Sequence, residues 1–304
     1  MAVSVAIDEP GMLLESPHWD DRTGTLLYVD HMGQRVHHWS PVTKHKDTYD
    51  IDCVVGAVVP RESGGAVVAA GTKFAFLDFE TGKLTSVATV DQHKPTNRFN
   101  DGKCDAAGRF WAGTIGKVDE GAPTQLERKA GSLYCLHTAG IVTKAFNEVD
   151  LSNGLTWTSD NSTMYYIDSL KYSVDAFDFD MPTGTLSMYF LCNRRQVMAF
   201  NPPVDGMPDG MCLDTDGKVW IAMYGAGQVL QVDPSTGTQL RSVKFPAPRT
   251  TSCCFGGPNL DVMYVTSTRA GYSPEEIQQN PLSGCLFQVT EMGARGTPGV
   301  CYKG

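Results

Sequence analysis

The sequence lacks any long hydrophobic run and any excess of positive charge. No apolar stretch reaches the roughly 18 residues that a membrane-spanning helix needs, and the N-terminus lacks the basic and apolar regions of a signal peptide. Asp and Glu number 34 against 25 Lys and Arg, a formal net charge of −9. Nucleic-acid binding needs clustered cations on one face. We therefore expect a cytoplasmic protein that binds neither membranes nor nucleic acids.

The nine cysteines lack the spacings of a disulfide framework or a zinc site. Their number is odd, and none forms a CxxC pair. Six lie in apolar runs typical of strands: Cys53, Cys104, Cys212, Cys253, Cys254 and Cys285. The adjacent Cys253 and Cys254 could form a redox pair, but alternation along a strand would point them to opposite faces. We favour packing in the core, where thiols act as small hydrophobic side chains.

Signatures of common hydrolases and calcium sensors are also missing. The GxSxG motif of serine hydrolases with an α/β fold does not occur. No loop has the D-x-[DN]-x-[DN]-G pattern of an EF-hand. The seven histidines show no spacing that recurs along the chain, so we nominate none as a metal ligand or a base.

The sequence does contain one strand–turn–strand pattern that occurs six times. A short apolar strand is followed by a turn rich in Gly, Asp or Asn and then by a second strand, usually with an aromatic residue. The copies begin at Glu15, Val55, Asp101, Asn153, Asp209 and Thr251. Their starts lie between 40 and 56 residues apart, and strand units of about 40 to 50 residues are typical of propeller blades. We therefore predict an all-β fold, one six-bladed β-propeller domain over residues 1–304.

The two ends of the chain predict how this propeller closes. The sixth copy ends near the C-terminus, and an unpaired sheet edge would invite aggregation. We expect the strand Ala2–Ile7 to pair with the strand Cys285–Thr290 within one blade.

Four residues with a carboxylate or amide group start copies of the repeat: Glu15, Asp101, Asn153 and Asp209. The first strand of each blade lines the central channel, so its first residues meet at one mouth. Oxygen ligands suit Ca²⁺, Mg²⁺ or Mn²⁺, whereas Zn²⁺ usually draws on imidazole or thiolate. A cation would also relieve repulsion between the carboxylates. The alternative is that these residues cap strand ends, since Asn-Gly and Asp-Gly are ordinary turn dipeptides. The repeats alone favour neither interpretation.

The stretches Asn97–Lys103 and Gly108–Thr114 resemble the gluconolactonase-like family, in particular its regucalcin or senescence marker protein branch. Further matching stretches are Glu15–Pro17 with Trp19, Ser152–Leu155, Tyr165–Ser169, Tyr172–Ala176, Pro208–Met211 and Thr250–Gly257. The resemblance covers nearly the whole chain. It implies a six-bladed propeller that holds one catalytic divalent cation in its channel.

This resemblance also implies roles for single residues. The family's protein ligands to the metal fall on Glu15, Asn153 and Asp209. We interpret Asp209 as the general base as well, although the metal alone could activate the attacking water.

Residues of the RFN motif and of the next loop would contact the substrate. They are Arg98, Asn100 and Glu120, and Asp119 could take the place of Glu120. An Arg pairing with a loop carboxylate would be the purely structural interpretation of Arg98. Arg98 would otherwise clamp substrate hydroxyls, while Asn100 would orient them or a water.

The predicted function is therefore hydrolysis of a sugar lactone, using one divalent cation: Ca²⁺, Mg²⁺, Mn²⁺ or Zn²⁺. A second hypothesis is another hydrolase on the same scaffold, such as an organophosphate hydrolase or the luciferin-regenerating enzyme. A third is a non-catalytic calcium-binding regulator. We expect a monomer or a weak dimer.

Overall fold

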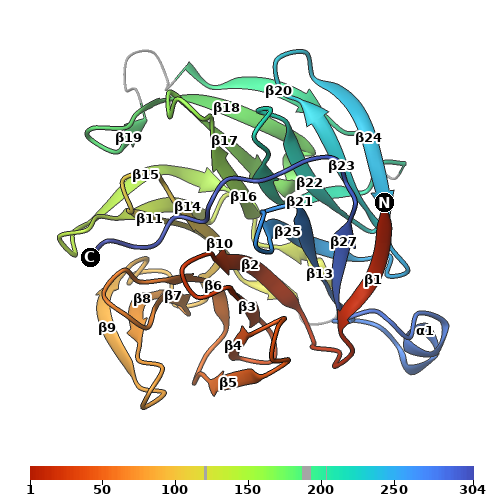
Figure 1. The fold of residues 1–304 in the computed structure, drawn as a ribbon. Helices are drawn as coiled ribbons and strands as arrows, with labels where there is room; N and C mark the ends of the chain where they lie inside the picture. The colour runs from red at the N-terminus through yellow and green to blue at the C-terminus, as the bar shows by residue number, and fades with distance from the viewer. Residues whose placement is uncertain (120–121, 187–192, 203) are drawn as a thin grey trace.

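Six antiparallel sheets are arranged radially around a central channel in the computed structural model (Figure 1). The structure describes residues 1–304 except 120–121, 187–192 and 203. This arrangement confirms the predicted all-β, six-bladed propeller. The innermost strands are β2, β6, β10, β16, β21 and β25.

The first three blades follow the chain from the inner strand outward. Blade 1 contains β2 (Leu14–Asp20), β3 (Thr25–Asp30), β4 (Arg35–Trp39) and β5 (Lys46–Asp50). Blade 2 contains β6 (Val55–Pro60), β7 (Ala66–Ala70), β8 (Lys73–Leu77) and β9 (Leu84–Thr89). Blade 3 contains β10 (Arg98–Cys104), β11 (Phe110–Ile115), β14 (Gly131–Leu136) and β15 (Val142–Val149). Between β11 and β14 a hairpin is formed by β12 (Val118–Asp119) and β13 (Ala122–Leu126).

The other three blades repeat the pattern with small additions. Blade 4 contains β16 (Ser152–Trp157), β17 (Thr163–Asp168) and β18 (Ser173–Asp180), and β18 pairs with both β19 (Thr185–Leu186) and β20 (Arg195–Ala199). A short 3-10 helix, η1 (Ser169–Lys171), follows β17. Blade 5 contains β21 (Met207–Leu213), β22 (Val219–Tyr224), β23 (Gln228–Asp233) and β24 (Thr238–Lys244). Blade 6 contains β25 (Thr250–Gly256), β26 (Val262–Ser267), β27 (Leu286–Thr290) and β1 (Ala2–Ile7).

Blade 6 joins the two ends of the chain, as predicted. Strand β1 runs antiparallel to β27, with Ala2 opposite Thr290 and Val5 opposite Phe287 (Figure 1). The α-helix α1 (Pro274–Gln279) lies between β26 and β27. No helix in the described part of the chain has the length and apolar character to cross a bilayer.

A C-terminal tail, residues 295–304, crosses one face of the propeller, which the sequence did not predict. It begins beside blade 5, where Asp214 and Gly296 form an isolated antiparallel β-bridge. It ends at blade 2, where Tyr302 N donates to the Pro60 carbonyl at 2.9 Å and Arg61 donates to the carbonyl of Gly304. Tyr302 is fully buried. The tail therefore links blades that are far apart in the sequence.

The core lies between neighbouring blades and contains most of the tryptophans and thiols. Trp111 and Trp220 are almost completely buried, and their indoles donate to Asp105 and Asp214, each at 2.8 Å. These aspartates also accept backbone N–H groups of the turn that follows the inner strand. One acidic residue thus anchors both a turn and a core aromatic ring in each of these two blades.

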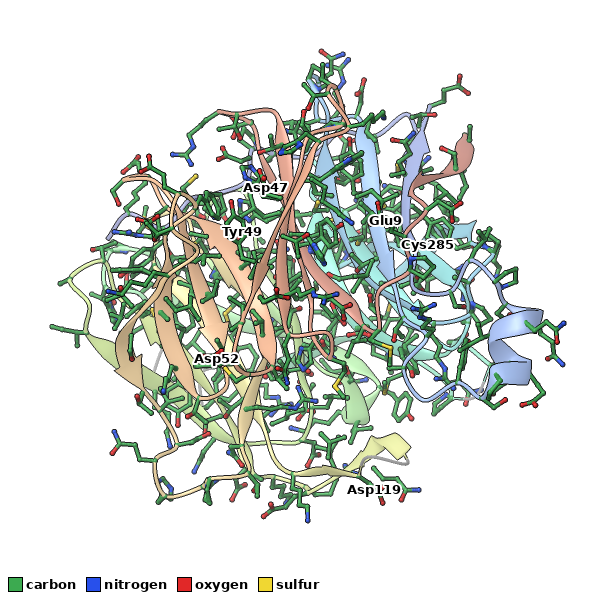
Figure 2. All side chains as sticks on the ribbon, turned by 90° about the horizontal axis from the view of Figure 1, so that it is seen from below. Glu9, Asp47, Tyr49, Asp52, Asp119 and Cys285 are labelled. Atoms are coloured by element: carbon green, nitrogen blue, oxygen red, sulfur yellow. The ribbon has the colours of Figure 1, made fainter. Side chains whose placement is uncertain are left out.

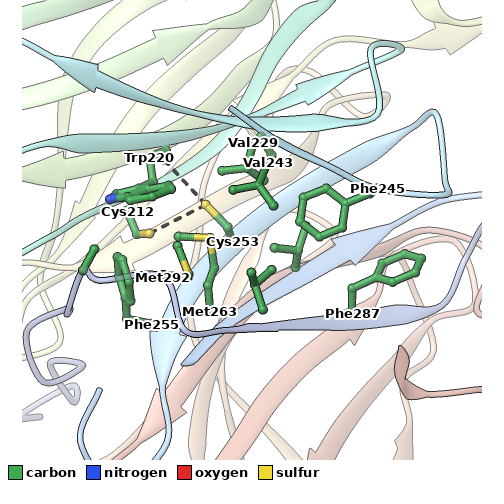
Figure 3. Packing of buried hydrophobic residues seen from close by; sticks show 14 of the residues in the cluster. Cys212, Trp220, Val229, Val243, Phe245, Cys253, Phe255, Met263, Phe287 and Met292 are labelled. Atoms are coloured by element: carbon green, nitrogen blue, oxygen red, sulfur yellow. Dashed lines mark hydrogen bonds between the residues drawn. The ribbon is translucent and has the colours of Figure 1, made fainter. Parts of the chain in front are cut away.

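The two adjacent cysteines of β25 face different clusters, as strand alternation predicted. Cys253 packs between blades 5 and 6, where its Sγ lies 3.6 Å from Sγ of Cys212 (Figure 3). Cys254 packs instead with Trp19 and Tyr264 at the junction of blades 6 and 1. The eight described cysteines are free thiols.

Candidate functional site

Polar residues at the second to fourth positions of four inner strands meet at one mouth of the channel. Glu15 lies in β2, Asp101 in β10, Asn153 in β16 and Asp209 in β21, and all four side chains are buried. The charges of Asp209 and Asp101 both act on Glu15. The structure therefore brings together the residues that the repeat had selected.

Every inner strand has a register irregularity at this same level. The irregular steps lie between Glu15 and His18, Val55 and Ala57, Phe99 and Asp101, Ser152 and Leu155, Pro208 and Met211, and Thr250 and Cys253. Bulges redirect side chains and are frequent beside active sites. Because one such irregularity occurs at the equivalent position of each inner strand, the mouth has the same local geometry in all six blades.

Glycines follow the polar residues because neighbouring inner strands approach closely. A Cβ on Gly154 would lie 2.7 Å from the carbonyl oxygen of Asp209, and one on Gly210 only 2.0 Å from Ser252 Oγ. Both glycines lie within strands and neither has a positive φ. The interpretation of these Asn-Gly and Asp-Gly pairs as turns is therefore wrong.

Burial and mutual repulsion act on the carboxyl groups at the mouth. Burial raises the pKa of Glu15 well above its usual range, and the charges of Asp209 and Asp101 raise it further. Burial also raises the pKa of Asp209, and Asp101 adds to this effect. Burial raises the pKa of Asp101 to about 6, while the Lys103 ammonium opposes the shift. Without a compensating cation, these groups resist carrying three negative charges at neutral pH.

The hydrogen bonds around these side chains leave oxygen atoms available for a cation. Among the described residues, the Asp209 carboxylate accepts no hydrogen bond, and Glu15 accepts one only from Ser16 N at 3.2 Å. The Asn153 amide is oriented by Ser169, because its Nδ2 donates to Ser169 Oγ at 2.8 Å. Charged and amide oxygens with few competing donors suit a hard divalent cation.

The carboxylates alone do not make a compact metal site. In the part of the chain that the structure describes, no three acidic, His or Cys side chains are grouped closely enough to hold a metal ion. The predicted ligand set is not made of carboxylates alone, because Asn153 adds an amide oxygen to Glu15 and Asp209. Asn100 adjoins this set, since its Nδ2 donates to Asn153 Oδ1 at 3.2 Å and to the Ser152 carbonyl at 2.8 Å.

Arg98 begins β10 and contacts a histidine from another blade. Its Nη1 donates to Nε2 of His31, in the turn between β3 and β4. Burial, assisted by the Arg98 charge, lowers the pKa of His31 well below its usual range, so the imidazole is neutral and accepts this bond. Burial lowers the pKa of Arg98 to about 10, which leaves the guanidinium protonated at neutral pH. The expected alternative, a carboxylate partner for Arg98, is not found among the described residues.

Sequence reasoning missed His31 because its partner comes from a different blade. The only local signal is its place directly after Asp30, which ends β3. The Asp30 carboxylate accepts the backbone N–H groups of Met12, Leu13 and Gly33 at 2.9 to 3.0 Å. Asp30 thus connects the approach to Glu15 with the turn that contains His31.

Blade 4 has the same device beside Asn153. Asp168 ends β17 and accepts the N–H groups of Asp150 and Leu151 at 3.2 and 2.9 Å. Lys171 pairs with the same carboxylate at 3.0 Å. In blades 1 and 4, an acidic residue at the end of the second strand therefore orders the chain that leads into the first strand.

The remaining predicted substrate residue, Glu120, lies outside the described residues. Its alternative, Asp119, is exposed at the end of β12, where it pairs with Ala122 of β13. Figure 2 shows Asp119 on this hairpin, away from the body of the propeller. The choice between the two residues stays a prediction.

Comparison with known sequences identifies relatives over nearly the full length of the chain. Residues 13–269 match the family described as SMP-30/Gluconolactonase/LRE-like region. Regucalcin of Oryctolagus cuniculus is 47% identical over 290 residues, which cover 95% of this chain and 94% of the relative.

Two solved structures are similar across almost the whole fold. The luciferin-regenerating enzyme superimposes with a TM-score of 0.90 at 31% sequence identity and covers 99% of each chain. A calcium-binding protein, regucalcin, from Agrobacterium tumefaciens superimposes with a TM-score of 0.90 at 25% identity, over 99% of this chain and 97% of its own.

Proposed function

Because this chain belongs to the SMP-30/gluconolactonase/LRE-like family, we propose that it hydrolyses sugar lactones with the help of one divalent cation. The observation that supports this most is the arrangement at the mouth of the channel. Three buried carboxylates and the Asn153 amide lie there, with Asn100 hydrogen-bonded to Asn153. A lactone is an internal ester, so its hydrolysis requires an activated water and stabilisation of negative charge on the carbonyl oxygen.

Glu15, Asn153 and Asp209 would hold the cation. Such an ion, when bound, supplies Lewis-acid polarisation of the carbonyl and lowers the pKa of a bound water. The sequence suggests that Ca²⁺, Mg²⁺ or Mn²⁺ suits this oxygen set better than Zn²⁺. The relative from Agrobacterium tumefaciens, described as calcium-binding, supports a divalent cation in general.

We assign to Asp209 the removal of a proton from the attacking water. Its carboxylate accepts no hydrogen bond within the described residues, so its lone pairs are available. Arg98 would bind substrate hydroxyl groups with the donors that His31 does not use, because a guanidinium has five N–H groups. Asn100 would orient substrate or water beside Asn153.

A metal panel assayed with several substrates tests this function. The protein is stripped with a chelator and reloaded with Ca²⁺, Mg²⁺, Mn²⁺ or Zn²⁺, and acid release from aldonolactones is followed with a pH indicator. We expect turnover only with metal, and loss of turnover in Glu15→Gln and Asn153→Ala. Asp216→Asn removes an exposed carboxylate from the same blade as Asp209 and serves as the control.

Two other outcomes would favour the rival functions. Calorimetric binding of Ca²⁺ without hydrolysis of any lactone would support a non-catalytic calcium-binding protein. This function is the second candidate because the relative from Agrobacterium tumefaciens is described as calcium-binding. Turnover of an organophosphate but of no lactone would indicate a different hydrolase on the same scaffold.

A further inference from the structure

The end of the channel opposite the carboxylates contains a cavity of about 310 Å³. Its walls come from the later residues of β2, β10, β16, β21 and β25, and residues 297–300 of the C-terminal tail border it. We call it the tail cavity. Three of the residues that line it are cysteines: Cys104, Cys212 and Cys254. A small solute in the tail cavity therefore lies beside residues that can be oxidised.

Cys212 also meets a cysteine of the neighbouring blade. Its Sγ lies 3.6 Å from Sγ of Cys253 (Figure 3). Cys212 belongs to β21 and Cys253 to β25, so the contact crosses from blade 5 to blade 6. No other two described cysteines make such a contact. The sequence suggested Cys254 as a redox partner of Cys253, but the thiol that contacts Cys253 is that of Cys212.

The backbones that carry these two thiols approach closely enough for a covalent bridge. A Cβ on Gly210 would lie 2.7 Å from Cα of Ser252, so β21 and β25 nearly touch just before the two cysteines. Disulfides join cysteines whose Cα atoms lie about 4.4 to 6.8 Å apart, a spacing that such close backbones allow. The sulfur atoms would move from 3.6 Å to about 2.0 Å apart, which rotation about the two Cα–Cβ bonds can supply.

The two thiols differ in exposure and in their hydrogen bonds. Cys253 is 1% exposed, does not line the tail cavity, and its S–H donates to the Trp220 carbonyl at 3.5 Å. Its contact with Cys212, together with burial, raises the pKa of Cys253 well above its usual range, so this thiol stays neutral. Cys212 is 7% exposed and lines the tail cavity. An oxidant close to water in size, such as hydrogen peroxide, therefore reaches Cys212 first.

We propose that Cys212 and Cys253 form an oxidative modification site, at which hydrogen peroxide or a small hydroperoxide links blades 5 and 6 by a disulfide. The Cys212 sulfur attacks the peroxide, the O–O bond breaks, and Cys212 becomes a sulfenic acid while water or an alcohol is released. The Cys253 sulfur then attacks the Cys212 sulfur. The S–O bond breaks, and the leaving hydroxide carries away the Cys253 proton as water. Two thiols are thus oxidised to one disulfide, and one peroxide is reduced.

Peptide mapping under non-reducing conditions tests the site on the full chain. The protein is treated with hydrogen peroxide, unfolded in the presence of an alkylating agent and digested with trypsin. Cys212 is the only cysteine in the tryptic peptide 196–218, whereas Cys253 and Cys254 share the peptide 250–269. We expect these two peptides to be joined, and dithiothreitol to separate them. Unjoined peptides, with Cys212 still a thiol or oxidised to a sulfinic acid, would overturn the proposal.

Two alanine variants identify the partner of Cys212. Cys254→Ala is the matched control, because it removes the adjacent thiol, which packs at the junction of blades 6 and 1. The joined peptides should form in Cys254→Ala as in the wild type and be absent from Cys253→Ala. The reverse result would move the bridge to Cys254 and refute the assignment. If a variant does not fold, fragmentation of the wild-type product between residues 253 and 254 still decides which sulfur is bridged.

Trapping with dimedone, a reagent specific for sulfenic acids, tests the order of the two steps. Cys253→Ala leaves Cys212 without a partner, so its sulfenic acid should persist after peroxide treatment and carry the dimedone adduct. Cys212→Ala should give no adduct at Cys253, which does not line the tail cavity. An adduct in Cys212→Ala but not in Cys253→Ala would refute Cys212 as the first thiol oxidised. None of these measurements depends on metal or on lactonase activity.

Discussion

The two ends of the channel are built from the same strands but have opposite chemistry. At the mouth, β2, β10 and β21 present Glu15, Asp101 and Asp209. A few residues further along, the same strands present His18, Lys103 and Leu213 beside aromatic walls. A short shift along a strand thus separates a mouth lined by carboxylates from a cavity whose charged lining residue, among those described, is Lys103.

Lys103 stands between these two environments. Its ammonium opposes the rise in the Asp101 pKa and lowers the pKa of His18. The channel is therefore not uniformly acidic, although the protein as a whole is. Substitutions at one end should therefore affect that end selectively.

The largest effect is expected from Asp209→Asn at the mouth. The variant retains an oxygen ligand but loses the base, so kcat for lactone hydrolysis should fall about 10²- to 10⁴-fold at saturating metal. Steady-state kinetics on metal-loaded protein measure this, with Asp216→Asn as the matched control. A rate near that of the wild type would mean that the metal activates the water without help from Asp209.

A smaller effect, on stability, is expected from Asp101→Asn in the metal-free protein. Burial raises the folded-state pKa of Asp101 to about 6, so the folded state binds the proton more tightly than the unfolded state does. The wild-type stability from this group is complete at pH values below about 4 and is lost as the pH rises through about 6. The wild type should therefore lose roughly 2–3 kcal/mol of unfolding free energy between pH 4 and pH 8 that the variant keeps.

Urea unfolding at both pH values, with a chelator present, tests this expectation. Comparison with the wild type cancels the contribution of the buried histidines, which runs in the opposite direction. A stability difference that does not change with pH would show that Asp101 is not protonated in the folded protein.

His31→Leu should affect substrate binding more than chemistry. The imidazole positions Arg98 by accepting its hydrogen bond, so the variant should raise KM about tenfold, with a smaller change in kcat. His31→Gln keeps an acceptor and should recover much of the loss. His45→Leu, at an exposed position, is the control. A fall in kcat alone, with KM unchanged, would argue against a positioning role.

Gly299→Ala at the tail should have the smallest effect. The added Cβ meets the Trp19 carbonyl at 2.5 Å, and such overpacking costs about 1–3 kcal/mol. We expect a melting temperature a few degrees lower and unchanged metal affinity, because the tail lies at the other end of the channel. Thr297→Ala, which removes atoms from the same segment, is the comparison. Loss of metal affinity in Gly299→Ala alone would show that the two ends are coupled.

Much of the fold could be predicted because its signals are local and repeated. Strand alternation and a unit of 40 to 56 residues were enough for six blades. The same alternation placed Cys253 and Cys254 on opposite faces, and the need to pair an edge joined β1 to β27. The repeat also selected Glu15, Asn153 and Asp209 together, because equivalent positions of a radial fold meet at one level.

Other features depend on contacts between segments that carry no shared local pattern. The hydrogen bond from Arg98 to His31 joins two blades that are not neighbours in the sequence. Position 154 must be glycine because a Cβ there would collide with the backbone of the next inner strand, although the Asn-Gly pair is typical of a turn.

The number of blades, their closure and the oxygen-rich mouth could thus be predicted from the sequence, since period-two alternation and repeat phase follow from the geometry of a single strand. The path of the C-terminal tail, and the cavity that Lys103, His18 and Trp157 line beneath it, could not be predicted in this way. These contacts form when distant segments pack together, and each occurs only once, so no repeated pattern in the sequence indicates them.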